Sequence, residues 1–278
     1  MKSNRIALFL LFCTVVFFNV FLLSEIEVRV RQINCFSYET AFRNFRDHAV
    51  PGEVAETFRS ASDSDMKRYS ELLTMYFATD NIVSDVDLLT SDIALVRKYR
   101  SEEFEEICGY VYAVWNDLEQ FPVGKIADNP DATISFADSW MQSRTFGGER
   151  GHEGCDLMAT VNQRGIYPIY SMTDGVVENI GWLRLGGYRI GIRSESGAYF
   201  YYAHLADYAE EFVQGDKVKA GTLLGFMGDT GYSDIPGTTG NFDVHLHLGI
   251  YLNDRNGQEF SVNSYPMLCY LYGQEPSS

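Results

Sequence analysis

The sequence predicts an α+β protein in which helices come first and an antiparallel β-sheet follows. An almost wholly apolar run occupies residues 6–23. Apolar side chains then recur at helical spacing between residues 25 and 120. Of the 24 glycines, 20 fall between Gly147 and Gly257, whereas residues 24–145 hold three. Glycine supplies the positive φ angles that tight turns require, so this density indicates many short strands joined by turns.

The apolar run at residues 6–23 is long enough to cross a membrane. As a helix of 18 residues it would span roughly 27 Å, against about 30 Å for a bilayer core. Lys2 and Arg5 precede it and should stay on the cytoplasmic side, which places the remainder of the chain outside. The alternative is a cleaved signal peptide, but such peptides have shorter apolar regions and end in small residues. We expect residues 1–24 to be a membrane anchor, with a secreted protein as the alternative.

Residues 25–120 are expected to form a helical domain. Apolar residues recur every three or four positions, as on one face of a helix. The two clearest stripes are Tyr69, Leu72, Leu73, Tyr76 and Phe77, and Phe104, Ile107, Cys108, Val111, Tyr112, Trp115 and Leu118. A shorter helix is expected from about Tyr38 to Ala49, before Pro51. We assign the stripes to a core, and we place His48, which follows Arg46 and Asp47, at the surface.

The second half alternates between strand-like runs and glycine turns. Runs at residues 176–180, 188–193 and 198–205 are rich in β-branched and aromatic residues, and residues 215–221 resemble a turn that leads into another strand. Such short, evenly punctuated runs favour an antiparallel sheet. Residues 121–138, which contain Pro122, Gly124 and Pro130, are expected to be a linker.

Charge and cysteine content exclude some classes of protein. The net charge of −16 argues against a nucleic-acid-binding protein, because such proteins carry a basic surface. The five cysteines are too scattered for a disulfide framework, so we expect free thiols. A Cys35–Cys108 or a Cys155–Cys269 bridge is left open.

Four of the five histidines lie in the glycine-rich half, and their spacing is typical of a metal site. His152 and Asp156 are four residues apart, which in an extended strand places both side chains on one face. Apolar residues alternate with His245 and His247, which therefore share the opposite face of a strand. His204 follows an aromatic-rich strand. Two histidines and a carboxylate, with one position left for water, are a recognised composition for catalytic zinc. Spacing alone also leaves a structural role open.

Six stretches in this half match one family in that family's order. They are Arg150–Asp156, Asp174–Val177, Tyr202–Leu205, Gly215–Gly221, Gly228–Gly231 and His245–His247. On these stretches the segment from Ser139 to Met267 resembles the M23 family of zinc metallopeptidases, the lysostaphin and LytM-type cell-wall endopeptidases. The resemblance implies a peptidase domain at residues 139–267, followed by a tail at residues 268–278.

The resemblance also implies roles for the histidines and a cofactor, one Zn²⁺ per chain. Its ligands would be His152, Asp156 and His247, with His204 and His245 acting beside the metal. We take His245 as the general base and His204 as a group that holds the developing oxyanion or the substrate. Which of the two takes the proton stays open.

The implied substrate is bacterial peptidoglycan, and the bond that is cut stays open. Arg150 and Tyr202 are the candidates for substrate binding, and Arg144 is a further candidate for contact with substrate carboxylates. Tyr201 could line the groove beside Tyr202, although packing within the strand is the favoured role for both tyrosines. Cys155 precedes Asp156 and is expected to serve packing, and residues 233–243 are a candidate substrate-side loop. The apolar run at residues 6–23 would contact the bacterial membrane, and a regulatory protein partner stays open.

Two alternatives have a different character. The protein could be a non-catalytic or autoinhibited relative of the family that binds cell wall or a partner, with the helical half blocking the groove. The intact set of histidines speaks against loss of catalysis. A biotinyl- or lipoyl-type carrier domain around residues 215–221 is remote, because neither Lys217 nor Lys219 has the sequence context of an attachment site.

Overall fold

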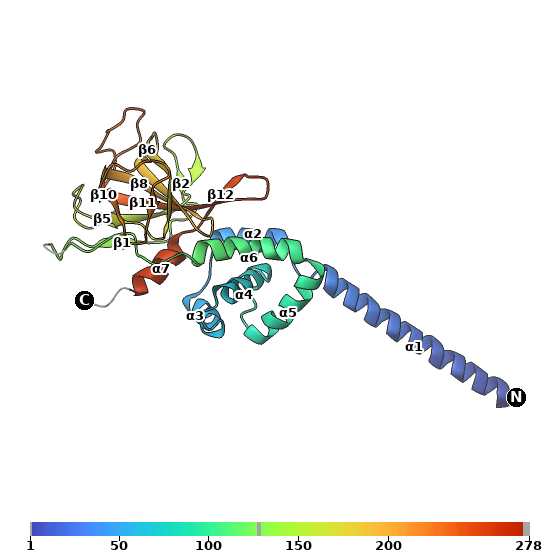
Figure 1. Ribbon diagram of the computed structural model, residues 1–278. Coiled ribbons are helices and arrows are strands. Elements are labelled where there is room, and N and C mark those ends of the chain that lie inside the picture. The colour runs from blue at the N-terminus through green and yellow to red at the C-terminus, as the bar shows by residue number, and fades with distance from the viewer. Residues whose placement is uncertain (1, 127–128, 275–278) are drawn as a thin grey trace.

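The computed structural model of the protein describes residues 2–126 and 129–274 (Figure 1). Its helices are α1 (Lys2–Ile33), α2 (Tyr38–Asp47), α3 (Gly52–Ala61), α4 (Met66–Ala78), α5 (Val86–Tyr99), α6 (Ser101–Trp115) and α7 (Tyr265–Gln274). Helix α1 projects away from the body, α2–α6 form a bundle, and the strands form a separate layer against which α7 lies (Figure 1). The predicted α+β fold class is confirmed.

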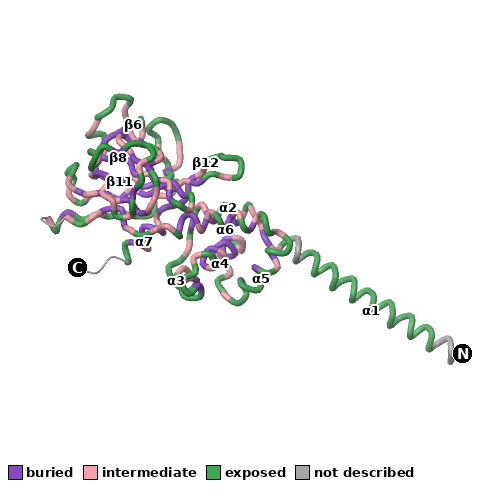
Figure 2. The backbone as a smooth tube through the Cα atoms, viewed as in Figure 1, coloured by how far each residue is buried: buried purple, intermediate pink, exposed green. Residues whose placement is uncertain are grey.

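Helix α1 is exposed over residues 6–30, as Figure 2 shows by colour. The segment Ile6–Val30 is long and apolar enough to cross a membrane, and none of its most apolar window is buried within the protein. The helix touches the rest of the molecule mainly through α5.

Helices α2–α6 pack around α4, whose residues are buried over most of its length. Asp65 begins α4 by accepting hydrogen bonds from the backbone N–H groups of Lys67 and Arg68, which have no partner inside the helix. Helix α6 begins at Ser101 and carries the predicted stripe from Phe104 to Trp115. Helices α3 and α5 were not anticipated. Helix α3 buries only Phe58, and α5 buries only Leu89, Ile93 and Val96. The apolar stripe of each helix is therefore too short to recognise in the sequence.

The prediction that His48 lies at the surface was wrong. His48 is fully buried at the end of α2, in a left-handed conformation with φ of 49°. Its Nδ1–H donates to the carbonyl of Phe45 at 3.2 Å, and its Nε2 accepts from Trp115 Nε1 at 3.0 Å. Burial lowers the pKa of His48 to about 4, so the ring is neutral. The deciding partner lies 67 residues away in the sequence.

The sheet is antiparallel throughout, as predicted. Its main order is β1-β4-β11-β8-β7-β6-β9, with β10 paired to β5 and β8, and β12 paired to β11, while β2 and β3 form a separate hairpin. The strands are β1 (Ile134–Phe136), β2 (Ser143–Arg144), β3 (Arg150–Gly151), β4 (Cys155–Ala159), β5 (Pro168–Tyr170), β6 (Gly175–Leu183), β7 (Gly187–Ser194), β8 (Tyr199–Tyr208), β9 (Lys217–Val218), β10 (Leu223–Met227), β11 (His245–Asn253) and β12 (Glu259–Val262).

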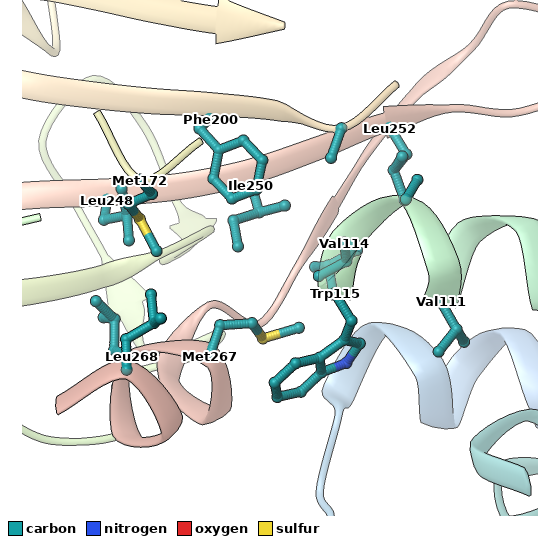
Figure 3. Close-up of a cluster of buried hydrophobic side chains, with 14 of the residues drawn as sticks. Val111, Val114, Trp115, Met172, Phe200, Leu248, Ile250, Leu252, Met267 and Leu268 are labelled. Atoms are coloured by element: carbon teal, nitrogen blue, oxygen red, sulfur yellow. The ribbon is translucent and has the colours of Figure 1, made fainter. Parts of the chain in front are cut away.

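One hydrophobic core joins the helices to the sheet. Figure 3 shows where the two meet: Val114 and Trp115 of α6 lie with Ile250 and Leu252 of β11 and with Met267 of α7. The even-numbered residues of β11 therefore face the helices. Because side chains alternate along a strand, its odd-numbered residues face the other way. Strand β11 thus carries packing on one face and leaves the opposite face for chemistry.

Polar contacts also fix the bundle to the sheet. Arg46 of α2 donates to the carbonyl of Ser261 on β12 at 3.0 Å. Arg255 after β11 pairs with Glu102 of α6 at 2.8 Å and also with Glu106. No disulfide bond joins the cysteines that the structure describes. The segment predicted to be a linker, residues 121–138, contributes Phe121 to the core. Most of helix α7 (Tyr265–Gln274) lies in the segment predicted to be a tail, but Met267, Leu268 and Leu271 of this helix are buried in the core.

Candidate metal centre and cleft

A cleft of about 570 Å³ lies over the open face of the sheet, and four of the five candidate residues line it. These are His152, Asp156, His204 and His247; His245 lies beside them. No lining residue precedes Arg144, so the described helices do not cover the cleft. A cavity of about 580 Å³ lies between the bundle and α7, but none of the five candidates lines it.

The candidate ligand atoms of His152, Asp156 and His247 form a small triangle. Asp156 Oδ1 lies 3.0 Å from His152 Nε2 and 3.0 Å from His247 Nδ1. The two ring nitrogens are 2.9 Å apart. Zinc binds nitrogen and oxygen at about 2.0–2.2 Å in tetrahedral geometry, which corresponds to ligand atoms roughly 3.3 Å apart. The three groups therefore fit a zinc ion after a slight widening, with a fourth position open.

Strand register brings the triangle together. Asp156 on β4 and His247 on β11 are directly paired, so their side chains leave the same face of the sheet side by side. His152 comes from the end of the β2–β3 hairpin, where its N–H donates to the carbonyl of Gln142 at 2.9 Å. Gly154, between His152 and Asp156 in the chain, must be a glycine, because an added Cβ would lie 2.6 Å from the carbonyl oxygen of Leu248.

Neighbouring groups orient the triangle. His152 Nδ1 lies 3.2 Å from the carbonyl of Ser139, which can only accept, so the proton is on Nδ1 and the Nε2 lone pair faces Asp156. Arg144 Nη2 donates to Asp156 Oδ2 at 2.7 Å. Burial raises the pKa of Asp156, but the adjacent imidazole rings of His152 and His247 outweigh burial and hold that pKa well below its ordinary value. Asp156 is therefore ionised.

His204 and His245 are held in the same way as each other. The Nδ1–H of His245 donates to the carbonyl of Asp243 at 2.7 Å, and that of His204 donates to the carbonyl of Thr230 at 2.8 Å. In the neutral form of each ring, Nε2 is therefore the unprotonated nitrogen. His245 Nε2 lies 3.9 Å from Asp156 Oδ1. Burial lowers the pKa of His204 well below its ordinary value, so this ring is neutral.

The loop before β11 packs against these two histidines. The ring of Phe242 lies 4.6 Å from that of His204 and 5.0 Å from that of His245, between ring centroids. Tyr232, just before the loop, lines the cleft and stacks on Phe146 at 4.3 Å. No residue of the predicted loop, 233–243, which the structure describes in full, lines the cleft itself; Phe242 packs against His204 and His245.

Tyr202, the sequence-based candidate for substrate binding, does not line the cleft. It is fully buried, and its hydroxyl accepts a hydrogen bond from the N–H of Met172. Tyr201 lines the cleft instead. The reason is an irregularity in β8 at His204, where φ is 64° and the pairing with β7 shifts by one residue. Simple alternation from His204 would have placed Tyr202 on its face, but the extra residue places Tyr201 there.

Sequence reasoning found Arg150 and Arg144, which both line the cleft, but missed Arg189 and Tyr251. Arg189 is one of two arginines in β7, with Arg193, and a charge between the apolar and aromatic residues of a strand is the signal that could have identified it. Cys155 is buried, its Sγ contacts the carbonyl of Ala137 at 3.4 Å, and burial raises the pKa of its thiol, in accord with a packing role.

The model of the family described as peptidase family M23 matches residues 150–260. L-Ala–D-Glu endopeptidase of Bacillus subtilis (strain 168) is 42% identical over 134 residues, which are 48% of this chain and 39% of that protein. Glycyl-glycine endopeptidase ALE-1 of Staphylococcus capitis is 34% identical over 99 residues, 35% of this chain and 24% of that protein. The matched part therefore spans well under half the length of these curated relatives.

A solved structure matches over a larger part of the chain. It is described as a putative glycyl-glycine endopeptidase lytM from Ruminococcus gnavus ATCC 29149 and is 42% identical, with a TM-score of 0.69. The match covers 83% of this chain and 90% of that one. Residues 134–274, which hold the sheet and α7, are only about half of the chain, so the likeness includes the helical bundle as well.

Proposed function

The chain belongs to peptidase family M23, and from this premise we propose that it is a zinc-dependent endopeptidase that cuts peptide bonds of bacterial peptidoglycan outside the cell membrane. The observation that carries the proposal is the triangle of His152, Asp156 and His247, with sides of 2.9–3.0 Å, at the floor of an open cleft. Its relatives are described as endopeptidases that act on L-Ala–D-Glu or glycyl-glycine bonds.

We assign the metal to those three residues, which offer two imidazole nitrogens and one ionised carboxylate. Bound zinc would supply Lewis acidity and would lower the pKa of a water molecule toward neutrality. Ser139 would hold the His152 ring in the orientation that presents Nε2. Arg144 would hold the second oxygen of Asp156, which leaves Oδ1 for the metal.

His245 is the proposed general base. Its Nδ1 proton is engaged by Asp243, so Nε2 is the atom that would take the proton of the attacking water and pass it to the leaving amine. His204 has the same tautomer and is neutral, so it presents a hydrogen-bond acceptor at Nε2. Two roles were considered for His204. This tautomer can accept a hydrogen bond from an N–H group of the substrate, whereas it has no proton on Nε2 to donate to an oxyanion.

The proposed location follows from α1. Its apolar segment would cross the bacterial membrane once, with Lys2 and Arg5 inside and the sheet outside, where peptidoglycan lies. Cleavage of the segment as a signal peptide would give a secreted enzyme with the same exposure to its substrate. In either case the open cleft would face the wall.

The test is digestion of purified cell wall by the full chain in detergent, loaded with zinc. Mass spectrometry of the released peptides would identify both cleavage and the new termini. We expect His247→Ala to abolish cleavage, by at least about 10³-fold in kcat/KM, because the ligand set is broken. Lys217→Ala, on the exposed edge strand β9, is the matched control and should cut normally. A zinc-loaded wild-type chain that cuts no wall type would overturn the proposal.

A further inference from the structure

Two arginines in the cleft have guanidinium groups without a partner among the described residues. Arg150 on β3 and Arg189 on β7 both line the cleft. Arg150 Nε and both Nε and Nη1 of Arg189 are buried, yet they make no hydrogen bond within residues 2–126 and 129–274. A buried N–H that has lost its water and gained no partner is destabilising, and native proteins hold few of them. Such groups indicate a ligand.

Two neighbouring arginines form ion pairs. Arg193, four residues further along β7, makes two bonds to Glu178 at 2.6 and 2.7 Å. Arg144, on the β2–β3 hairpin, pairs with Asp156 at 2.7 Å through Nη2, although its Nε is also buried without a hydrogen bond among the described residues. Glu153 and Glu259 line the same cleft as Arg150 and Arg189, but no ion pair joins them to these arginines in the part of the chain described. A chain with a net charge of −16 thus keeps two cationic groups unpaired at one place.

Three tyrosines form the surroundings of these arginines. Tyr199, Tyr201 and Tyr251 line the cleft, with ring centroids 6.1–6.5 Å apart. Burial raises the pKa of all three hydroxyls, so they stay neutral. Arg189 and Arg150 both lie near enough to Tyr201 to act electrostatically on its hydroxyl. The result is an aromatic wall with neutral hydroxyls and two unpaired arginines, in a cleft that Glu153 and Glu259 also line. Buried guanidinium groups bind an anion more strongly than they would in water.

This cationic region adjoins the metal triangle. Arg150 is two residues before His152, and the ring of Tyr201 lies 6.0 Å from that of His247. His204 and His245 pack together with Phe242. A peptide bound across the triangle would therefore place one of its residues against Arg150, Arg189 and Tyr201.

We propose that Arg150 and Arg189 form a carboxylate-binding subsite that makes the enzyme require a free carboxylate close to the bond that is cut. Guanidinium groups bind carboxylates through paired, charge-assisted hydrogen bonds. The proposal rests on the proposed peptidase function and adds a substrate class to it: acidic stem peptides, in which γ-linked D-glutamate keeps its α-carboxylate. Neutral glycine bridges, which carry no such group, are not substrates.

A matched pair of peptides tests the subsite. One contains L-Ala-γ-D-Glu-L-Lys-D-Ala, and the other replaces γ-D-glutamate with its α-amide, D-isoglutamine. For the zinc-loaded full chain in detergent we expect kcat/KM to be about 10- to 100-fold higher for the acid, mainly through KM, since a hydrogen-bonded charge is lost in the amide. Equal cleavage of the two would overturn the subsite while leaving the peptidase function intact. Cleavage of neither peptide, nor of wall, would instead count against the peptidase function.

Variants separate binding from a structural role. Arg189→Gln and Arg150→Gln should each lower kcat/KM for the acid and leave the amide unchanged. Arg189→Lys should keep part of the preference, because it retains the charge but not the two-pronged geometry. Lys217→Gln removes one positive charge from the exposed strand β9 and is the control. An equal loss on both peptides in the arginine variants would show that these residues only support the fold and would overturn the proposal.

The source of the carboxylate is resolved by two further arms. One amidates the C-terminal D-Ala of the acidic peptide, and the other offers pentaglycine. Calorimetric titration of the His245→Ala variant with each peptide measures binding without turnover. Loss of binding only on amidation of glutamate would support the subsite, whereas loss only on amidation of D-Ala would overturn its assignment to the glutamate carboxylate. Binding of pentaglycine as tight as that of the acidic peptide would overturn it.

Discussion

Both halves of the molecule bury histidine, but the helical half and the sheet use it differently. His48, in the helical half, has both ring nitrogens engaged, one by Phe45 and the other by Trp115. In the sheet half, His152, His204 and His245 each engage Nδ1 with a backbone carbonyl. Nε2 of His152 then meets only the other candidate ligands, Asp156 and His247. A buried histidine is thus structural when both nitrogens bond to groups of the core, and a candidate for chemistry when one nitrogen meets other candidate ligands or no hydrogen-bond partner.

The same contrast holds for the two faces of the sheet. The face toward the helices is packed with apolar residues from α6, α7 and β11 (Figure 3). The opposite face carries the histidines, Asp156 and the arginines. The described helices line none of the cleft, so their contribution is to cover the apolar face and to hold β11 in place.

The largest expected effect comes from removing the helical half. A chain of residues 139–278 would expose Ile250, Leu252 and Met267, which lose Val114 and Trp115 as packing partners. Burial of each such side chain contributes about 1.5–3 kcal/mol, so the loss approaches the whole stability of a domain. We expect this chain to lack a cooperative urea transition, in contrast to residues 34–278. A shortened chain that unfolds cooperatively and cuts wall faster would show instead that the helices inhibit.

A smaller effect is expected from pH at His48. Its pKa falls from 6.5 in the unfolded chain to about 4 in the folded protein. Stability is full above pH 6.5 and falls as the pH drops toward 4, because the unfolded chain binds the proton that the folded protein refuses. The loss is about 2 kcal/mol at pH 5.

Urea unfolding at pH 7 and pH 5, with a chelator present, measures this effect. His48→Gln keeps a group that can accept from Trp115 but does not titrate in this range. Between pH 7 and pH 5 the free energy of unfolding of this variant should therefore fall by about 2 kcal/mol less than that of the wild type. The same change in both proteins would mean that His48 is not the titrating group and that its ring is accessible to protons.

The smallest effect is expected at Ser139. Its hydroxyl and its carbonyl both contact Nδ1 of His152, at 3.0 and 3.2 Å. Ser139→Ala removes the hydroxyl but leaves the carbonyl as an acceptor, so zinc affinity should fall by about tenfold, the low end for such groups. Competition with a chromogenic chelator measures it, with Ser143→Ala, an exposed neighbour on β2, as control. An unchanged affinity would mean that the carbonyl alone orients the ring.

The sequence predicted the sheet well because its patterns are local. Each pattern is complete within a few residues: apolar residues alternate with His245 and His247, and His152 and Asp156 are four residues apart. What it could not provide depends on distant contacts. The burial of His48 depends on Trp115, and the exposure of Tyr201 in place of Tyr202 depends on one irregular residue in β8.

The helices were predicted less completely for a related reason. Helix α7 is apolar around its whole circumference and contains Pro266 and Gly273, so it shows no helical stripe. It is stable because the sheet lies on one side and α6 on the other (Figure 3). Such an element is specified by its packing and not by its own periodicity.

The metal assignment itself is tested most directly by X-ray absorption at the zinc edge of the full chain. The account predicts one zinc per chain, with two imidazole nitrogens, one carboxylate oxygen and one further oxygen at about 2.0–2.1 Å and no sulfur. His247→Ala should remove one imidazole, whereas His48→Gln should change nothing. A sulfur ligand from Cys155, or a spectrum that responds to His48 and not to His247, would contradict the account.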